Sequence, residues 1–158
     1  MTDQNIIPEV SALWEKRINC AQATGKGLLD HYKFIEAGDV LMASFIPYGG
    51  GFMSGNVCGA VSGTLAATSY ILKEKKCEQS EIQQVTDQLK EKFAKEFGSI
   101  NCADIMAPFF DMRNINIKDF KLDNTDYTKS APYKLCTSCV NKATIMAKEL
   151  IEKHLSKL

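Results

Sequence analysis

Six cysteines are the residues of this chain best suited to chemistry. They stand among 158 residues at the following positions: Cys20, Cys58, Cys77, Cys102, Cys136 and Cys139. Thiolates bind soft metal ions and exchange disulfides, and a chain in a reducing compartment uses several cysteines for metal binding or redox chemistry more often than for structural disulfides. Any one cysteine can be a small buried hydrophobe, but six together favour a shared function.

The last two cysteines form a C-x-x-C motif, Cys136-Thr137-Ser138-Cys139, at the predicted start of the last helix. Three residues of separation place both sulfurs on one side of the first turn, where backbone N–H groups and the helix dipole favour thiolates. This arrangement suits a dithiol switch or metal ligation equally. Val140 stands where a haem attachment motif needs histidine, so that function is excluded.

Three cysteines stand where a predicted element begins after a flexible or capping stretch. Cys58 follows a glycine loop, Cys102 follows Gly98-Ser99, and Cys136 follows Ser130-Ala131-Pro132. Helix starts directed at one point would supply N–H donors to sulfur, which stabilises anionic thiolates and clusters. The recurrence predicts one site assembled by tertiary structure.

Other candidate sites are weaker. The glycine loop Gly49–Gly55 has Ser54 where a dinucleotide motif needs its last glycine, and no G-K-[ST] follows it. His31 and His154 are too few and too scattered for a zinc or catalytic assignment, and His154 is expected to be a packing residue. Cys77 lies in a lysine-rich connection, so we expect an exposed, incidental thiol.

Apolar residues recur at helical spacing over most of the chain, which predicts an all-α fold. We expect one compact helical bundle over residues 1–158, with a long irregular loop before the last helix. A capping box is predicted at Ser80-Glu81-Ile82-Gln83, and Gly25-Lys26-Gly27 should interrupt or end the first helix. The predicted helices are 9–24, 56–73, 80–97 and 135–154; the short segment 37–45 is undecided between helix and strand, and 108–134 is irregular.

Two glycines lie four residues apart in the predicted helix that follows Cys58. Gly59 and Gly63 each weaken a helix interior by ~1 kcal/mol relative to alanine, so they need a reason. We expect one face of this helix to approach another backbone or a prosthetic group closely, and we assign both glycines to cofactor binding.

Charge and hydropathy narrow the possible partners. Nineteen Lys and Arg residues balance nineteen Asp and Glu residues, so there is no basic surface typical of nucleic-acid binding. No apolar run approaches the ~20 residues of a membrane span, and the polar start of the chain is unlike a secretory signal. We expect a cytoplasmic protein that has no membrane span and does not bind nucleic acid. A homodimer is an open option.

Four segments, in order, resemble the C_GCAxxG_C_C family, which is named for its cysteines and is thought to be redox-active. They are Asn19–Ala23, Gly49–Gly51 followed by Cys58-Gly59-Ala60-Val61-Ser62-Gly63, Phe97–Cys102, and Cys136 with its helix. The resemblance covers nearly the whole chain. It implies that Cys20, Cys58, Cys102 and Cys136 are the family cysteines, whereas Cys139 stands where the family usually has an apolar residue and Cys77 has no counterpart.

The resemblance and the cysteines together lead to one principal hypothesis and two alternatives. The principal one is an iron–sulfur cluster held by Cys20, Cys58, Cys102 and Cys136, with Cys139 replacing or supplementing Cys136, for electron transfer or redox sensing. The alternatives are a dithiol–disulfide oxidoreductase using Cys136 and Cys139, and a closed structural zinc site. A redox partner protein is implied, but its identity is left open.

Overall fold

The computed structural model describes residues 5–114 and 127–158. The all-α prediction is confirmed, since these residues form helices and no strand. The seven α-helices of the described part are α1 (Ile7–Trp14), α2 (Cys20–His31), α3 (Ile35–Ser44), α4 (Gly59–Glu74), α5 (Gln79–Phe97), α6 (Cys102–Met106) and α7 (Ala131–Leu155). No helix of the described residues is long and apolar enough to cross a membrane.

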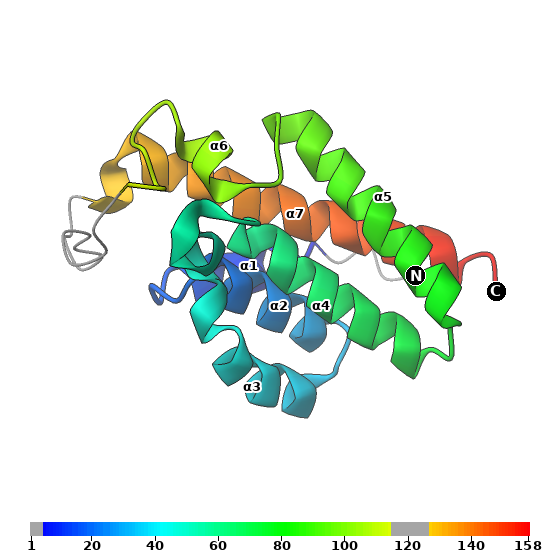
Figure 1. The fold of residues 1–158 in the computed structure, drawn as a ribbon. Helices are drawn as coiled ribbons and strands as arrows, with labels where there is room; N and C mark the ends of the chain where they lie inside the picture. Colours follow the sequence, from blue (N-terminus) through cyan, green and yellow to red (C-terminus); the bar gives the residue numbers. More distant parts are fainter. Residues whose placement is uncertain (1–4, 115–126) are drawn as a thin grey trace.

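Helix α4 lies at the centre of the bundle. It packs against α2, α5 and α7, while α2 also contacts α1 and α3 (Figure 1). The short helix α6, the turn before α4 and the first turns of α7 gather at one end of the bundle (Figure 1). This end therefore brings together segments that are far apart in the sequence.

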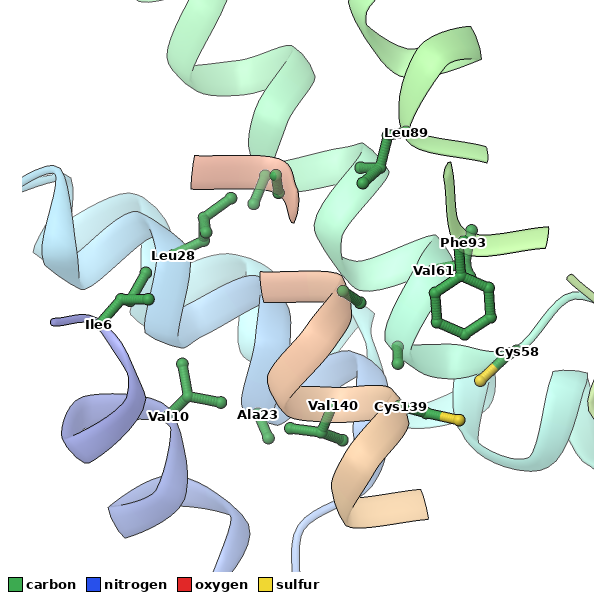
Figure 2. Close-up of a cluster of buried hydrophobic side chains, with 14 of the residues drawn as sticks. Ile6, Val10, Ala23, Leu28, Cys58, Val61, Leu89, Phe93, Cys139 and Val140 are labelled. Carbon is green, nitrogen blue, oxygen red and sulfur yellow. The ribbon is translucent and has the colours of Figure 1, made fainter. Parts of the chain in front are cut away.

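The core between these helices is formed by aliphatic and aromatic side chains. Phe93, Leu28, Ile71 and Ile151 are among its largest fully buried side chains. Cys58 and Cys139 belong to the same buried cluster as Phe93, and Figure 2 draws both sulfurs at its edge. The packed core fixes α4 and α7, so it also fixes the cysteines that these helices carry.

The helix predicted over 9–24 is two helices. Helix α1 ends at Trp14, and Arg17 has a left-handed φ of 60° in the connection. Asn19 then caps α2: its side chain accepts the Gln22 N–H, while the Gln22 side chain accepts the Asn19 N–H. The apolar spacing continues across both helices, so periodicity alone hid the break that this capping box makes.

The glycines expected to interrupt the first helix lie inside α2. A Cβ at Gly27 would lie 2.6 Å from the Val10 side chain, and one at Gly25 would lie 2.4 Å from the Phe45 ring. These glycines let α1 and the end of α3 pack closely on α2. They reflect packing rather than a turn.

Helix α5 matches its prediction closely, with a different cap. Glu78, rather than Ser80, is the N-cap residue, and its reciprocal partner is Glu81. Gly98 ends the helix in the left-handed conformation, with φ 80°, as expected from its position.

The segment before the last helix is only partly covered by the described residues. Residues 107–114 form turns, and Tyr127–Lys129 form a single short helical turn; the rest of the predicted loop, 115–126, lies outside the described residues. Helix α7 begins at Ala131 with Ser130 as its N-cap, which is earlier than predicted. Segment 37–45, left undecided by its sequence, lies mainly in α3.

Candidate functional site

A cavity of about 180 Å³ lies at the end of the bundle where α6 and the start of α7 meet. Its walls are mainly apolar, and cysteines from four segments line it: Cys20, Cys58, Cys102, Cys136 and Cys139. Cys77 is not among the lining residues. The structure thus gathers all five cysteines that the sequence placed at one site and leaves out the sixth.

Cys58 and Cys102 are held side by side by the backbone. The Cys58 N–H donates to the carbonyl of Ile100 at 2.8 Å, and the Cys102 N–H donates to the carbonyl of Asn56 at 2.8 Å. These bonds flank the isolated antiparallel bridge between Val57 and Asn101. These contacts hold the starts of α4 and α6 together. The sequence predicted this for Cys58 and Cys102, because both stand where a helix begins.

Cys20 is also at a helix start, which the sequence did not predict. It is the first residue of α2, directly after the Asn19 cap. The Asn19 amide donates to the carbonyls of Phe45, at 3.1 Å, and Ile46, at 2.9 Å. The same residue thus begins α2 and ties Cys20 to the segment that leads into the glycine loop.

Cys136 and Cys139 occupy a different position from the predicted one. Because α7 begins at Ala131, Cys136 is the sixth residue of the helix and lies beyond its first turn. The free N–H groups and the dipole of that helix start are therefore not available to the C-x-x-C sulfurs. The residue that gains this stabilisation is Cys58, the N-cap of α4.

Four of the five sulfurs interact in two pairs. Contact with the Cys136 thiol, followed by burial, raises the pKa of Cys20 well above its usual value. Contact with the Cys139 thiol lowers the pKa of Cys58, with further help from the backbone N–H groups of Ala60 and Val61 against the opposing effect of burial. Each cysteine of the C-x-x-C motif therefore has its partner on another element.

The other buried thiols keep their protons. Contact with Cys58, followed by burial, raises the pKa of Cys139 strongly. Burial, followed by the charges of Cys58 and Cys20, raises the pKa of Cys102. In the protein without a bound group, the thiolate character of this pair therefore lies at Cys58, with Cys139 as the thiol that stabilises it.

Aromatic residues and methionines form the apolar walls. Trp14 stacks on Tyr133 with ring centroids 5.2 Å apart, and its indole N–H donates to Thr137 Oγ1 at 2.9 Å. The Cys102 thiol donates to Met112 Sδ at 3.3 Å. Sequence reasoning missed these residues, because they come from separate segments with no common spacing.

Arg17 supplies positive charge at the cavity. It is the one charged side chain among the lining residues of the described chain. Its left-handed backbone, φ 60°, belongs to the connection that separates α1 from α2. The residue is exposed, and its charge opposes the rise that burial causes in the pKa of Tyr133.

The glycine loop forms another wall through an unusual backbone. Gly50, Gly51, Phe52 and Met53 all have left-handed φ values, between 53° and 60°. A Cβ at Gly51 would lie 2.2 Å from the carbonyl oxygen of Asn56. Left-handed non-glycine residues cost ~1–3 kcal/mol each and cluster at functional sites, so this turn supports the location of the site.

Gly59 and Gly63 make their close approach to α2. A Cβ at Gly63 would lie 2.4 Å from both the Ala21 carbonyl oxygen and Thr24 Oγ1, and one at Gly59 would lie 3.2 Å from the Ala21 nitrogen. Neither glycine lines the cavity. The close backbone approach expected from the sequence is present, while the assignment of these glycines to cofactor binding stays a prediction.

The spacing of the sulfurs bears on which group could fit. Four sulfurs around one zinc ion at ~2.3 Å would lie about 3.8 Å apart, but no three of the cysteine sulfurs lie within 4.8 Å of one another. All six cysteines belong to the described residues. The sulfurs are therefore spaced more widely than the ligands of one tetrahedral ion.

Comparison with known proteins gives one match. The chain matches the family described as "Putative redox-active protein (C_GCAxxG_C_C)" over residues 18–150, a span that contains all six cysteines. No curated protein and no solved structure matches it. Since the match covers most of the chain and the family cysteines line one cavity, the chain belongs to the C_GCAxxG_C_C family of redox-active proteins.

Proposed function

We propose that the cysteine-lined cavity holds an iron–sulfur cluster for electron transfer or redox sensing. The observation that carries the proposal is the convergence of five cysteines from four segments on one apolar cavity. Cys20, Cys58 and Cys102 would supply three thiolates, and Cys136 or Cys139 the fourth. Such a cluster supplies one-electron chemistry when bound, and four thiolates match the ligand number of the common cluster types.

The residues around the cavity would each contribute to holding such a group. The α4 N-terminus already stabilises one thiolate, at Cys58, and the positive charge of Arg17 would offset part of the charge of an anionic group in the cavity. The aromatic and methionine walls limit access of water, which tunes the potential of a buried centre. The thiols with raised pKa values would release their protons on ligation, because metal ions bind the thiolate form.

The first experiment is metal analysis of protein purified without oxygen. We expect iron and acid-labile sulfide in stoichiometric amounts, and a brown colour that bleaches on reduction. Cys58→Ser should lose most of the iron, while Cys77→Ser, the matched control outside the cavity, should retain it. Protein that contains neither iron nor sulfide after anaerobic reconstitution would refute the proposal.

A second set of variants identifies the fourth ligand. Cys136→Ser and Cys139→Ser remove neighbouring sulfurs from the same face of α7, one per variant. We expect one variant to lose the cluster and the other to retain it with an altered electron paramagnetic resonance spectrum. Loss in both variants would mean that both cysteines are required.

Dithiol–disulfide exchange is a second candidate, favoured by the lowered pKa of Cys58. The Cys58 thiolate would attack a substrate disulfide and release one substrate thiolate; Cys139 would then displace the second, leaving a Cys58–Cys139 disulfide and two reduced substrate sulfurs. This pairing differs from the Cys136–Cys139 pair expected from the sequence. The test is to treat the metal-free, folded Cys139→Ser variant with oxidised glutathione. Accumulation of a mixed disulfide at Cys58 would support this candidate over the cluster.

A further inference from the structure

A second group of metal-binding side chains lies far from the cavity. The ligand atoms of Cys77, Glu81 and His154 lie within 4.8 Å of one another, and it is the one such group of three among the described residues. The group sits beyond the C-terminus of α4, whereas Cys58 precedes its N-terminus. Sixteen helical residues at ~1.5 Å each separate the two places by about 24 Å.

The backbone holds Cys77 firmly in position. Lys76 has a left-handed φ of 67°, and two hydrogen bonds close the end of α4: Cys77 N–H to the Leu72 carbonyl and Lys76 N–H to the Lys73 carbonyl, both at 3.0 Å. This is the Schellman arrangement, here formed without glycine. Cys77 is 2% exposed, so the expectation that this thiol is exposed is wrong.

His154 reaches the same point with an unsatisfied nitrogen. Its Nε2 atom is buried and has no hydrogen-bond partner, so packing leaves the polar end of this side chain unsatisfied. The nearest carboxylate oxygen, Glu81 Oε1, is 3.6 Å away, which is too long for a hydrogen bond. It is close to the ~3.3 Å that separates a nitrogen and an oxygen ligand on one tetrahedral zinc ion.

Glu81 is oriented by its own helix. Its second oxygen, Oε2, accepts the backbone N–H of Glu78 at 2.7 Å, as part of the cap of α5. The first oxygen is thereby directed toward His154. A ligand carboxylate fixed by a second hydrogen bond is the arrangement that metal sites use to orient their ligands.

We propose that Cys77, Glu81 and His154 form a zinc-type divalent metal site, independent of the cavity. Thiolate, carboxylate and neutral imidazole are the ligands that zinc takes in proteins, and their summed charge balances that of the ion at a partly buried position. Three protein ligands leave a fourth coordination position open. Binding would join the α4–α5 connection to the C-terminal end of α7.

Cobalt(II) is a spectroscopic probe for such a site. Under anaerobic conditions, the parent protein should bind one more equivalent of Co²⁺ than the Cys77→Ser variant. This extra equivalent should show a thiolate-to-cobalt charge-transfer band and the d–d bands of tetrahedral Co²⁺. Zn²⁺ should displace it. Glu81→Gln keeps an acceptor for the α5 cap and should weaken binding about tenfold or more, which tests the site even if Cys77→Ser folds poorly.

Two controls separate this site from the cavity and from nonspecific histidine binding. His31→Gln removes the other histidine of the chain, which pairs with Glu9 at 3.0 Å, and should bind Co²⁺ like the parent. Iron and sulfide content should be the same in all these variants, so failure here is distinguishable from failure of the cluster proposal. Equal Co²⁺ uptake by the parent and Cys77→Ser would overturn the proposal and leave a His154–Glu81 ion pair.

Discussion

At the scale of single residues, the site is defined by which cysteine meets which. Cys58 combines an N-cap position with a thiol neighbour, Cys139, and both lower its pKa. Cys20 meets Cys136, and contact between these two partly buried thiols raises the pKa of Cys20 instead. The chemical difference between the cysteines therefore comes from their partners, not from their residue type.

Replacing Cys139 tests this view of Cys58. Because Cys139 is the largest cause of the lowered pKa, Cys139→Ala should raise the pKa of Cys58 and shift its alkylation profile to higher pH. In metal-free protein near neutral pH, we expect alkylation of Cys58 by iodoacetamide to slow roughly severalfold, since the thiolate is the reactive form. The measurement is mass-spectrometric labelling as a function of pH.

Cys136→Ala is the matched control for that experiment, because it removes the neighbouring C-x-x-C thiol without touching the Cys58–Cys139 contact. It should lower the pKa of Cys20, whose main raising influence is Cys136, and leave the Cys58 profile in place. If both variants shift the pH dependence of Cys58 alkylation equally, the lowered pKa of Cys58 does not depend specifically on Cys139.

At the scale of elements, the contact between α2 and α4 sets the distance between two site cysteines. Cys20 begins α2 and Cys58 precedes α4, while Gly59 and Gly63 let the two backbones meet just beyond those residues. A side chain at either glycine would push the helices apart at the end where the cavity lies.

Gly63→Ala is therefore expected to destabilise the protein by ~1–3 kcal/mol, because its Cβ would overlap the Ala21 carbonyl and Thr24 hydroxyl oxygens. Urea unfolding of parent and variant measures the change. Gly38→Ala in α3 is the control: its nearest obstacle, at 2.8 Å, is the movable Asp30 carboxylate, so helix propensity should offset much of the clash. An unchanged or raised stability for Gly63→Ala would show that the helices can separate freely.

Asn19 links three elements, and its two functions can be separated. Asn19→Asp keeps the acceptor that caps α2 but loses the amide donors to Phe45 and Ile46, whereas Asn19→Ala loses both. We expect Asn19→Ala to cost about 1–2 kcal/mol from the cap alone, and Asn19→Asp to cost less.

Thermal melts compare the two Asn19 variants with the parent, and anaerobic iron content reports on the position of Cys20. If Asn19→Asp lowers the melting temperature more than Asn19→Ala does, the helix cap is not the main contribution of Asn19 to stability. Equal iron retention in all three proteins would mean that Cys20 is positioned by other contacts.

At the scale of the whole molecule, two groups of potential ligands occupy opposite ends of α4. One is the cavity with five cysteines; the other is Cys77, Glu81 and His154. Trp14, the single tryptophan of the chain, lines only the first. Its fluorescence therefore reports on the cavity and not on the group at Cys77.

We expect cluster assembly in the cavity to quench Trp14 fluorescence strongly, because the indole lies in the cavity wall. Zn²⁺ bound at Cys77 should leave the emission nearly unchanged, because that group lies at the other end of α4, a helix about 24 Å long. Fluorescence titration of metal-free protein with each component measures both effects. Strong quenching by Zn²⁺ that survives Cys77→Ser would place the zinc in the cavity instead.

The sequence by itself determined the fold class and the members of the cavity. Apolar periodicity predicts the helices because each must bury one face, and C-x-x-C and the family pattern identify Cys20, Cys58, Cys102, Cys136 and Cys139. The C-terminal signal of α5, Gly98, was also readable, whereas the N-cap is Glu78 rather than the predicted Ser80. The sequence predicted helix boundaries less accurately where the apolar spacing continues across a break, as it does between α1 and α2.

Only the tertiary structure decided how the cysteines pair and what surrounds them. The Val57–Asn101 bridge, the contact of Cys58 with Cys139 and the stacking of Trp14 on Tyr133 all join residues distant in sequence. The sequence predicted an exposed Cys77, but the structure buries it, because burial depends on which helices pack together. Local spacing carries the helical period, whereas pKa values and ligand sets depend on distances that packing alone fixes.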